Sequence, residues 1–271
     1  MTQYNVSFAG AGRVAGALCR AMHSSGIAIR QIVSETPARG RALAAKYNAS
    51  WSSNLLFHDP VDVIIVAVPD HRLREVLNEI KCPRNALVAH TAGSYGLDVF
   101  PERTERKGVF YPLQTFSEKR RINFKGLPFF IEAPDKKQSD MLAALAGTLG
   151  AKVFLADADH RKMLHLAAVF ACNFLNHMLT AGSEISERGG FSFDLLHPLI
   201  KETISKALKN GPEASQTGPA VRNDRNTIAK HLDLLSFSPD LQKVYQEVTR
   251  SIIEHYKNNQ EWQTSKRKYQ K

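Results

Sequence analysis

Three small residues near the start of the chain could cradle a phosphorylated ligand. They lie in the run Gly10-Ala11-Gly12-Arg13-Val14-Ala15-Gly16, which has the spacing G-x-G-x-x-[GA] between a predicted strand and a predicted helix. Gly10 would permit a tight turn, Gly12 would let a pyrophosphate approach the backbone, and Ala15 would let the helix pack closely on the strand. The helix start adds unpaired N–H groups and a positive dipole end. We expect a dinucleotide here, held by Gly10, Gly12, Arg13 and Val14. The alternative is a glycine-rich turn without a ligand.

The residues after the second predicted strand bear on which dinucleotide would bind. Glu35 could accept hydrogen bonds from both ribose hydroxyls and would repel a 2′-phosphate, which favours NAD. Ser34, Thr36, Arg39 and Arg41 could instead donate hydrogen bonds to a 2′-phosphate, which favours NADP. The expected cofactor is therefore NADP or NAD, with Ser34, Glu35 and Thr36 at its ribose.

Small and polar residues also end the next two predicted strands. The expected cofactor contacts there are Ala67, Val68, Pro69 and Thr91. The carboxyl ends of parallel strands line the ligand crevice of such a sheet, and small side chains would let a nicotinamide ring approach. His71 and His90 lie nearby in the sequence, but a surface or core-edge histidine explains each of them equally well.

Polar residues on a long apolar segment are the first candidates for catalysis. His165 and Asn173 are eight residues apart, so at about 100° per residue they lie about 80° apart and can face one cleft. An unpartnered buried polar group costs about 1–3 kcal/mol, so either a functional cleft or a core network must satisfy them. The sequence has neither the ligand spacing of a metal site nor a G-x-S-x-G elbow, so we expect no metal.

The elements that must position these residues change character along the chain. Up to Asp157, apolar segments alternate with helical patterns, which favours a doubly wound α/β sheet of the Rossmann type. Strands are predicted at Val6–Ala9, Ala28–Val33, Val61–Val68, Ala86–Thr91, Phe129–Ile131 and Val153–Leu155, with Gly108–Leu155 otherwise a less regular extension. The later predicted elements are the helices His160–Glu187, long and buried, Phe193–Leu208, Asn226–Leu235 and Pro239–Asn258.

Length and charge fit two domains. The chain has 271 residues, 43% of them hydrophobic, and 36 Lys and Arg against 26 Asp and Glu, which excludes a disordered or collagen-like chain. We expect a dinucleotide domain over 1–155, a helical substrate and dimerisation domain over 156–260 and a basic tail over 261–271. Residues 1–156 hold 20 basic and 13 acidic residues, a bias that suits a phosphorylated cofactor. No nucleic-acid-binding signature occurs.

The cysteines and the N-terminus indicate a reducing compartment. Cys19, Cys82 and Cys172 are far apart and form no CxxC pair, which argues against a disulfide framework. The first residues lack the pattern of a signal peptide, and no apolar run reaches the ~20 residues of a membrane helix. We therefore expect a cytoplasmic protein that does not bind a membrane.

Several motifs together resemble a known family. They are GAGRVAG, VIIVAVPD, HTAGS, YPLQTFS, HLAAVFACNF and TGPAVRNDR, and the resemblance extends from about Tyr4 to Tyr256. The chain resembles bacterial proteins often labelled NADP oxidoreductases, which join a Rossmann-like domain to a helical domain of unknown function. That helical domain is similar to the C-terminal domain of 6-phosphogluconate dehydrogenase, and pyrroline-5-carboxylate reductase is a more distant relative. The resemblance implies this two-part fold and a homodimer formed through the helical domain.

The chain departs from the family pattern at positions that bear on chemistry. NADP-preferring relatives commonly carry Arg where this chain has Glu35. Many members have His-Pro-Leu-Gln where this chain has Tyr111-Pro112-Leu113-Gln114. Tyr111 could donate a proton in place of that histidine, although an ordinary tyrosine is poorly matched to neutral pH. Related β-hydroxyacid dehydrogenases use a Lys four residues before an Asn, and here Val169 precedes Asn173.

These residues favour a hydride-transferring enzyme. We expect an NAD(P)-dependent oxidoreductase acting on a small, anionic imino, keto or hydroxy substrate, with His165, Asn173 and Tyr111 as its catalytic residues. A non-catalytic dinucleotide-binding sensor or scaffold is the alternative, and the absent Lys–Asn pair speaks for it. A deazaflavin-linked reductase is a third possibility. Turnover of an imino, keto or hydroxy acid would distinguish an enzyme from a sensor.

Overall fold

The computed structural model describes residues 4–117 and 120–269, and it describes side chains as far as Lys257. The chain divides into two compact units, Met1–Phe174 and Leu175–Lys271. The predicted domain boundary after Leu155 falls at the end of the last strand. The predicted basic tail, 261–271, enters the last helix, and its side chains lie outside the described residues.

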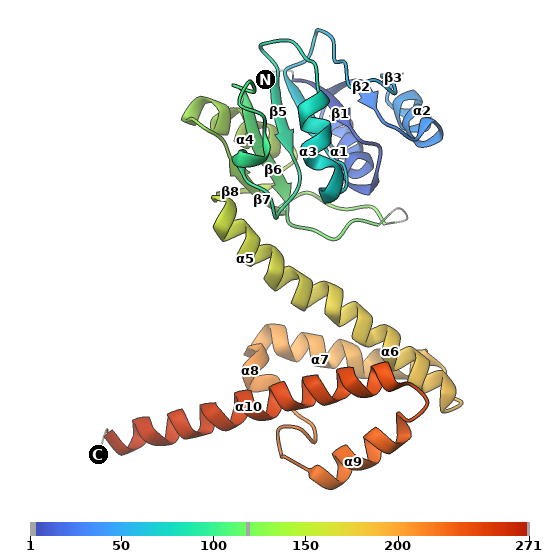
Figure 1. Ribbon diagram of the computed structural model, residues 1–271, viewed down its shortest axis with the longest axis vertical. Helices are drawn as coiled ribbons and strands as arrows, with labels where there is room; N and C mark the ends of the chain where they lie inside the picture. Colours follow the sequence, from blue (N-terminus) through green and yellow to red (C-terminus); the bar gives the residue numbers. More distant parts are fainter. Residues whose placement is uncertain (1–3, 118–119, 270–271) are drawn as a thin grey trace. The chain divides into compact units, whose positions relative to one another are not determined.

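One sheet forms the centre of the first unit (Figure 1). Within the described residues its strand order is β3 (Ser50–Ser52), β2 (Ala28–Val33), β1 (Asn5–Ala9), β4 (Val63–Val66), β5 (Leu87–His90), β6 (Lys107–Pro112), β7 (Pro128–Glu132) and β8 (Lys152–Leu155). All neighbours are parallel except β6 and β7. The strand order reverses between β1 and β4, which is where ligands bind in doubly wound sheets.

Helices cover both faces of this sheet. On one face, α1 (Arg13–Ser24), α2 (Pro37–Lys46) and α4 (Lys136–Thr148) bury apolar side chains such as Leu18 and Leu142. On the other face, α3 (Asp70–Glu79) and the 3₁₀ turn η1 (Leu97–Val99) bury Leu73 and Val99. The Rossmann-like fold class is thereby confirmed.

The structure corrects some predicted elements. The strand predicted at Val61–Val68 is only Val63–Val66, because its last residues already belong to the loop that leads into α3. Two strands were not predicted. One is β3, a short and polar edge strand, and the other is β6, which falls within the predicted irregular extension.

A continuous helical stretch from 158 to 188 links the two units. It consists of α5 (Ala158–Ala168), the π-helical segment η2 (Val169–Phe174) and α6 (Leu175–Arg188). The predicted long helix is therefore present, but its predicted burial is wrong for the single chain, since Met163 and Phe170 are 68% and 62% exposed. Among the described residues, this stretch alone is long and apolar enough to cross a membrane, a test that core helices of soluble proteins also pass.

The second unit is helical, as expected. After α6 come the turn η3 (Phe193–Leu196) and the helices α7 (His197–Asn210), α8 (Pro212–Ser215), α9 (Arg225–Leu234) and α10 (Pro239–Tyr269) (Figure 1). A hydrogen bond of 2.8 Å between His231 Nδ1 and the Tyr245 hydroxyl joins α9 to α10. Among the described side chains of this unit, the buried hydrophobic residues are only Ala220 and Leu235.

Candidate active site

The glycine loop has the geometry that its spacing predicts. Gly10 has φ +110°, and a Cβ on it would lie 2.3 Å from the carbonyl oxygen of Ala67 in the neighbouring loop, so a side chain cannot fit. A Cβ on Gly12 would meet no atom within 4 Å. Gly12 is also the N-cap of α1, where no side chain accepts a hydrogen bond from the first N–H groups. Open space in front of unpaired helix N–H groups suits a pyrophosphate.

Strand register brings three loops together at one edge of the sheet. Ala9 lies beside Val33 on one neighbour and Val66 on the other, so the segments after β1, β2 and β4 share that edge. They line a cavity of about 1100 Å³. Of the predicted cofactor contacts, the lining residues include Gly10, Gly12, Ser34, Glu35, Thr36, Ala67, Val68 and Pro69.

Three predicted contacts do not line this cavity. The Arg13 guanidinium donates to the carbonyl oxygen of Phe116 at 3.4 Å, and Val14 is half-buried on α1. Thr91 donates both its N–H and its hydroxyl to the carbonyl oxygen of Val66, at 3.1 and 3.4 Å. Thr91 therefore ties the ends of β4 and β5 together.

The part of the cavity lined by Ser34, Glu35 and Thr36 contains both kinds of side chain that the sequence offers. Glu35 is exposed and forms an ion pair with Arg72 of α3, and Arg39 lines the cavity beside them. The Ser34 hydroxyl is already engaged, since it donates to the Thr36 carbonyl at 3.2 Å and accepts from Trp51. Arg41, which lies over the Trp51 ring at 4.6 Å, is not a lining residue. An acidic group and two guanidinium groups thus lie together in this part of the cavity.

Tyr111 and His165 meet although they are far apart in the sequence. Tyr111 lies on β6 and His165 on α5, and the Tyr111 hydroxyl is 3.2 Å from His165 Nδ1. The Tyr111 ring packs over Gly93, where a Cβ would lie 2.6 Å from Tyr111 Cζ. Burial, and then the negative charge of Asp70, raises the pKa of Tyr111. The tyrosine therefore keeps its proton at neutral pH and can act as a donor.

The third predicted catalytic residue, Asn173, does not join this pair. It lies in η2 and is exposed, and it forms no hydrogen bond with Tyr111 or His165 among the described contacts. The predicted angle between His165 and Asn173 assumed about 100° per residue. A π-helical segment turns by a different angle, so that angle does not hold here.

The sequence interpretation missed a polar pair beside Tyr111. The Ser94 hydroxyl donates to Asp70 Oδ2 at 2.7 Å, joining the residues that follow β5 and β4. Asp70 is the first residue of α3, and Ser94 follows Gly93 directly. Asp70 ends the motif VIIVAVPD and Ser94 ends the motif HTAGS. Their contact could not be predicted from these motifs, because it depends on the parallel register of β4 and β5.

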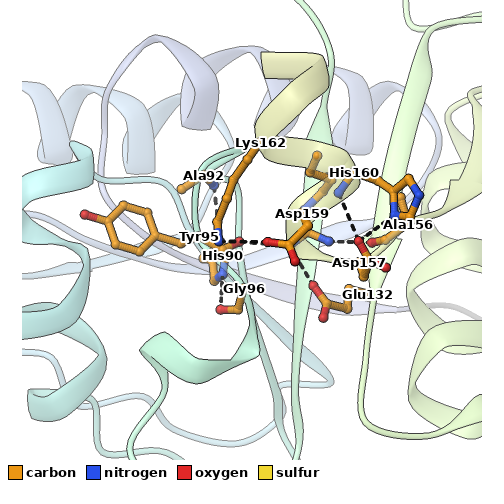
Figure 2. Close-up of polar contacts among 11 residues, drawn as sticks. His90, Ala92, Tyr95, Gly96, Glu132, Ala156, Asp157, Asp159, His160 and Lys162 are labelled. Atoms are coloured by element: carbon orange, nitrogen blue, oxygen red, sulfur yellow. Dashed lines mark hydrogen bonds and ion pairs between the residues drawn. The ribbon is translucent and has the colours of Figure 1, made fainter. Parts of the chain in front are cut away.

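His90 has a structural role. It is wholly buried, accepts a hydrogen bond from the Ala92 N–H and lies 3.3 Å from the Gly96 carbonyl oxygen (Figure 2). Burial is the main cause that lowers its pKa to about 4. At neutral pH it is an uncharged core histidine that holds the loop after β5.

A buried arginine anchors the helix that carries His165. Arg161 is fully buried and forms an ion pair of 2.6 Å with Glu132 at the end of β7. Its guanidinium also donates to the carbonyl oxygens of Tyr95 and Ala156. Asp157 caps α5 by accepting from the His160 N–H at 3.0 Å (Figure 2). These contacts fix the first turn of α5, and His165 follows about one turn later.

The loop 217–225 of the helical unit has a clear structural role. Asp224 caps α9, accepting from the N–H and the hydroxyl of Thr227 at 3.1 and 2.8 Å. Asn223 adopts φ +51°, a conformation that Asn tolerates better than most residues. The loop therefore ends in the N-cap residue of α9.

Comparisons with known proteins agree with this architecture. Residues 5–93 match the family described as NADP oxidoreductase coenzyme F420-dependent, and residues 127–252 match a domain of unknown function, DUF2520. No curated protein matches the chain. A Thermotoga maritima protein, 24% identical with a TM-score of 0.68, covers 94% of this chain and 99% of its own, and shares the fold.

Another solved structure is similar enough to show the family of this chain. It is a Bacteroides fragilis protein described as an NADP oxidoreductase, with 39% identity and a TM-score of 0.85 over 93% of this chain and 98% of that one. An imine reductase from Myxococcus stipitatus in complex with NADP+ has the same fold at 18% identity and a TM-score of 0.62, over 94% of this chain and 93% of that one. These likenesses support a dinucleotide-dependent oxidoreductase that uses NADP or NAD. The chain belongs to the family of NADP oxidoreductases in which a Rossmann-like domain precedes a helical domain.

Proposed function

We propose that this protein transfers a hydride between NADPH or NADH and a small C=N or C=O substrate, with Tyr111 and His165 handling the proton. The observation that carries this proposal is the 3.2 Å contact between Tyr111 and His165 beside the carboxyl ends of the parallel strands. Hydride transfer needs little else from a protein than orientation of both reactants and a proton donor.

The cavity suits the dinucleotide on its own geometry. Gly10 and Gly12 leave room for the pyrophosphate at the start of α1, and Ser34, Glu35 and Thr36 stand where the adenosine ribose would lie. Ala67, Val68 and Pro69 would contact the part that follows along β4. Glu35 favours NADH, whereas Arg39 and Arg72 offer charge for the 2′-phosphate of NADPH. Either dinucleotide thus fits, and the bound nicotinamide would supply or accept the hydride.

The protein's own residues supply the proton. In the reductive direction, the Tyr111 hydroxyl donates its proton to the substrate nitrogen or oxygen while the carbon accepts the hydride. A protonated His165 can then return a proton to the Tyr111 oxygen through Nδ1, because these two atoms are already within hydrogen-bond distance. In the oxidative direction, the same two groups remove the proton.

Substitution of Tyr111 tests the proposal. In Tyr111→Phe the donor is absent, and we expect kcat for reduction to fall by about 10²-fold or more, while NADPH binding measured by fluorescence changes less than twofold. Tyr245→Phe is a matched control, because it breaks a tyrosine–histidine hydrogen bond of the same kind on α10. Equal effects of the two substitutions would contradict the assignment. Dinucleotide binding without turnover of any imine, ketone or alcohol would favour the sensor function.

We further propose that the protein acts as a homodimer. The helical unit has many exposed apolar side chains, including Met178, Ile185, Leu199 and Leu208, and little buried hydrophobic surface of its own. Exposed apolar surface on this scale typically marks an interface. The family resemblance suggests a second copy of the chain as the partner.

A further inference from the structure

We infer that Asp70 makes this active site selective for imine and amine substrates over the corresponding ketones and alcohols. The inference rests on the proposed function, since it takes Tyr111 as the proton donor. It departs from the expectation of an anionic substrate, because the substrate would then carry positive charge at its reacting nitrogen. The proposal depends on which charges lie beside Tyr111.

Geometry places the Asp70 carboxylate next to the proposed donor. Asp70 follows β4, Ser94 follows β5 and Tyr111 lies on β6, and these three strands are neighbours in the sheet. Ser94 binds Asp70 at 2.7 Å, and the residue before it, Gly93, lies against the Tyr111 ring. The Asp70 charge is also one of the two causes that raise the Tyr111 pKa. The carboxylate thus lies close enough to act on charge that develops at the donor.

No positively charged side chain pairs with the Asp70 carboxylate among the described residues. Its hydrogen-bond partner, Ser94, is neutral. The guanidinium groups in this region have other partners, since Arg72 binds Glu35 and Glu75, and Arg161 binds Glu132. The N-terminus of α3 opposes the carboxylate with only about half a positive charge. Among the described residues, Asp70 is therefore a carboxylate without an ion-pair partner whose charge acts on Tyr111.

This charge acts in opposite senses on the two substrate classes. When Tyr111 protonates an imine nitrogen and protonated His165 returns a proton to the Tyr111 oxygen, the nitrogen is left as a cation beside a neutral tyrosine. Hydride addition to the carbon then breaks the C=N π bond and gives a neutral amine. Asp70 stabilises that cation before and during hydride addition. When a ketone is reduced, negative charge builds on the oxygen as the hydride arrives, and Asp70 opposes it. Fixed charges aimed at developing charge change the rate selectively.

A matched set of six-membered rings tests the inference. The probes are piperidine and cyclohexanol for binding, and tetrahydropyridine and cyclohexanone for turnover with NADPH. We expect the protein to bind piperidinium at least about tenfold more tightly than cyclohexanol in calorimetry. We expect Asp70→Asn to lose about tenfold in piperidinium affinity and in kcat/KM for tetrahydropyridine, with little loss for cyclohexanol or cyclohexanone.

The controls separate local charge from net charge and from folding. Asp140→Asn removes the same charge from an exposed position on α4 and should change neither preference. Asp70→Ser keeps a short polar residue at the start of α3 and should behave like Asp70→Asn. The inference is overturned if wild type prefers cyclohexanol or cyclohexanone, or if both Asp70 variants keep the wild-type preference.

Binding of the ring probes is measured without dinucleotide, so it tests the Asp70 selectivity independently of the proposed oxidoreductase function. If piperidinium binds through Asp70 but no substrate is turned over with NADPH or NADH, the proposed oxidoreductase function fails and the charge selectivity stands. If Tyr111→Phe abolishes turnover but Asp70→Asn leaves the imine-to-ketone ratio unchanged, the function stands and the selectivity fails.

Discussion

At the scale of single residues, two neighbouring glycines serve different purposes. Gly10 is required by the fold, because of its positive φ and the 2.3 Å approach of Ala67 to a Cβ. Gly12 has φ −80° and open space at its Cβ, so the fold does not require a glycine there. A ligand that approaches the backbone closely would explain glycine at position 12.

Substitutions at these two glycines should therefore have opposite effects. Gly12→Asp places a good N-cap residue at the start of α1, so stability should stay equal or rise by a few tenths of a kcal/mol. The carboxylate would occupy and repel the pyrophosphate position, and NADH and NADPH affinity should each fall by at least about 100-fold. Gly10→Ala should lower the free energy of unfolding by about 2 kcal/mol or more. Urea unfolding and fluorescence titration measure both effects. Unchanged dinucleotide binding in Gly12→Asp would remove the phosphate site from this loop.

His90 predicts a pH dependence of stability. Its pKa is lowered to about 4 in the folded protein, whereas an unfolded histidine titrates near 6.5. A group with a depressed folded pKa stabilises the protein fully above its unfolded pKa, and this contribution is lost as the pH falls from about 6.5 to about 4. The loss is about 3 kcal/mol. Urea unfolding at pH 7 and pH 4.5 should show a smaller drop for His90→Gln, which does not titrate, and an equal drop would contradict the account.

Sequence reasoning could propose Tyr111 and His165 one at a time, but not their contact. The two residues are 54 positions apart, and their meeting depends on where β6 ends and how α5 leaves the sheet. Asp70 and Ser94 had a weaker signal, because an Asp at a helix start and a Ser after a strand are common structural choices. Only the sheet register makes them a pair.

At the scale of elements, the parallel strands were the most predictable part. Buried β-branched runs such as Val63–Val66 follow directly from a sheet covered on both faces. β3 and β6 were missed for physical reasons. β3 is an edge strand of three polar or half-buried residues, and β6 contains Pro112, a residue that argues against an interior strand. Their strand conformation comes from pairing with β2, β5 and β7.

The anchoring of α5 gives a prediction at this scale. Arg161→Met removes the cation from a buried ion pair and leaves Glu132 without its partner, so the free energy of unfolding should fall by about 2–4 kcal/mol. Because the first turn of α5 would loosen, His165 should also move away from Tyr111, which NMR of the histidine ring signals can detect. Lys162→Met breaks only the exposed pair with Asp159 and is the control. Equal stabilities of the two variants would show that Arg161 does not anchor the helix.

At the scale of the whole molecule, the sequence correctly predicted that a helical part follows the sheet. The predicted burial of the long helix, His160–Glu187, was wrong for the single chain. Apolar composition predicts that a surface will be covered, but it does not say whether the same chain or another copy covers it. In the single chain, Met163, Leu166 and Phe170 are at least half exposed. A cytoplasmic location and the absence of membrane binding stay predictions.

The exposed apolar surface predicts self-association. We expect sedimentation velocity to give a dimer at micromolar concentration. Met178 and Ile185 are seven residues apart on α6, so they lie on the same face of that helix. The double substitution Met178→Glu with Ile185→Glu should shift the protein toward monomer, because burying two carboxylates in an apolar interface is costly. Lys201→Glu adds negative charge at an exposed polar position of α7 and should leave the dimer intact. A monomeric wild-type protein would contradict the homodimer.

The central claim is that a bound nicotinamide dinucleotide gives its hydride to a substrate beside Tyr111 and His165. The most direct measurement uses NADPH, and separately NADH, with deuterium at the transferable position of the nicotinamide, followed by mass spectrometry of the product. We predict one deuterium on the reduced carbon of the product with the wild-type protein, and formation of that product at least about 10²-fold more slowly with Tyr111→Phe. A product without deuterium, or equal rates for the two proteins, would contradict the account.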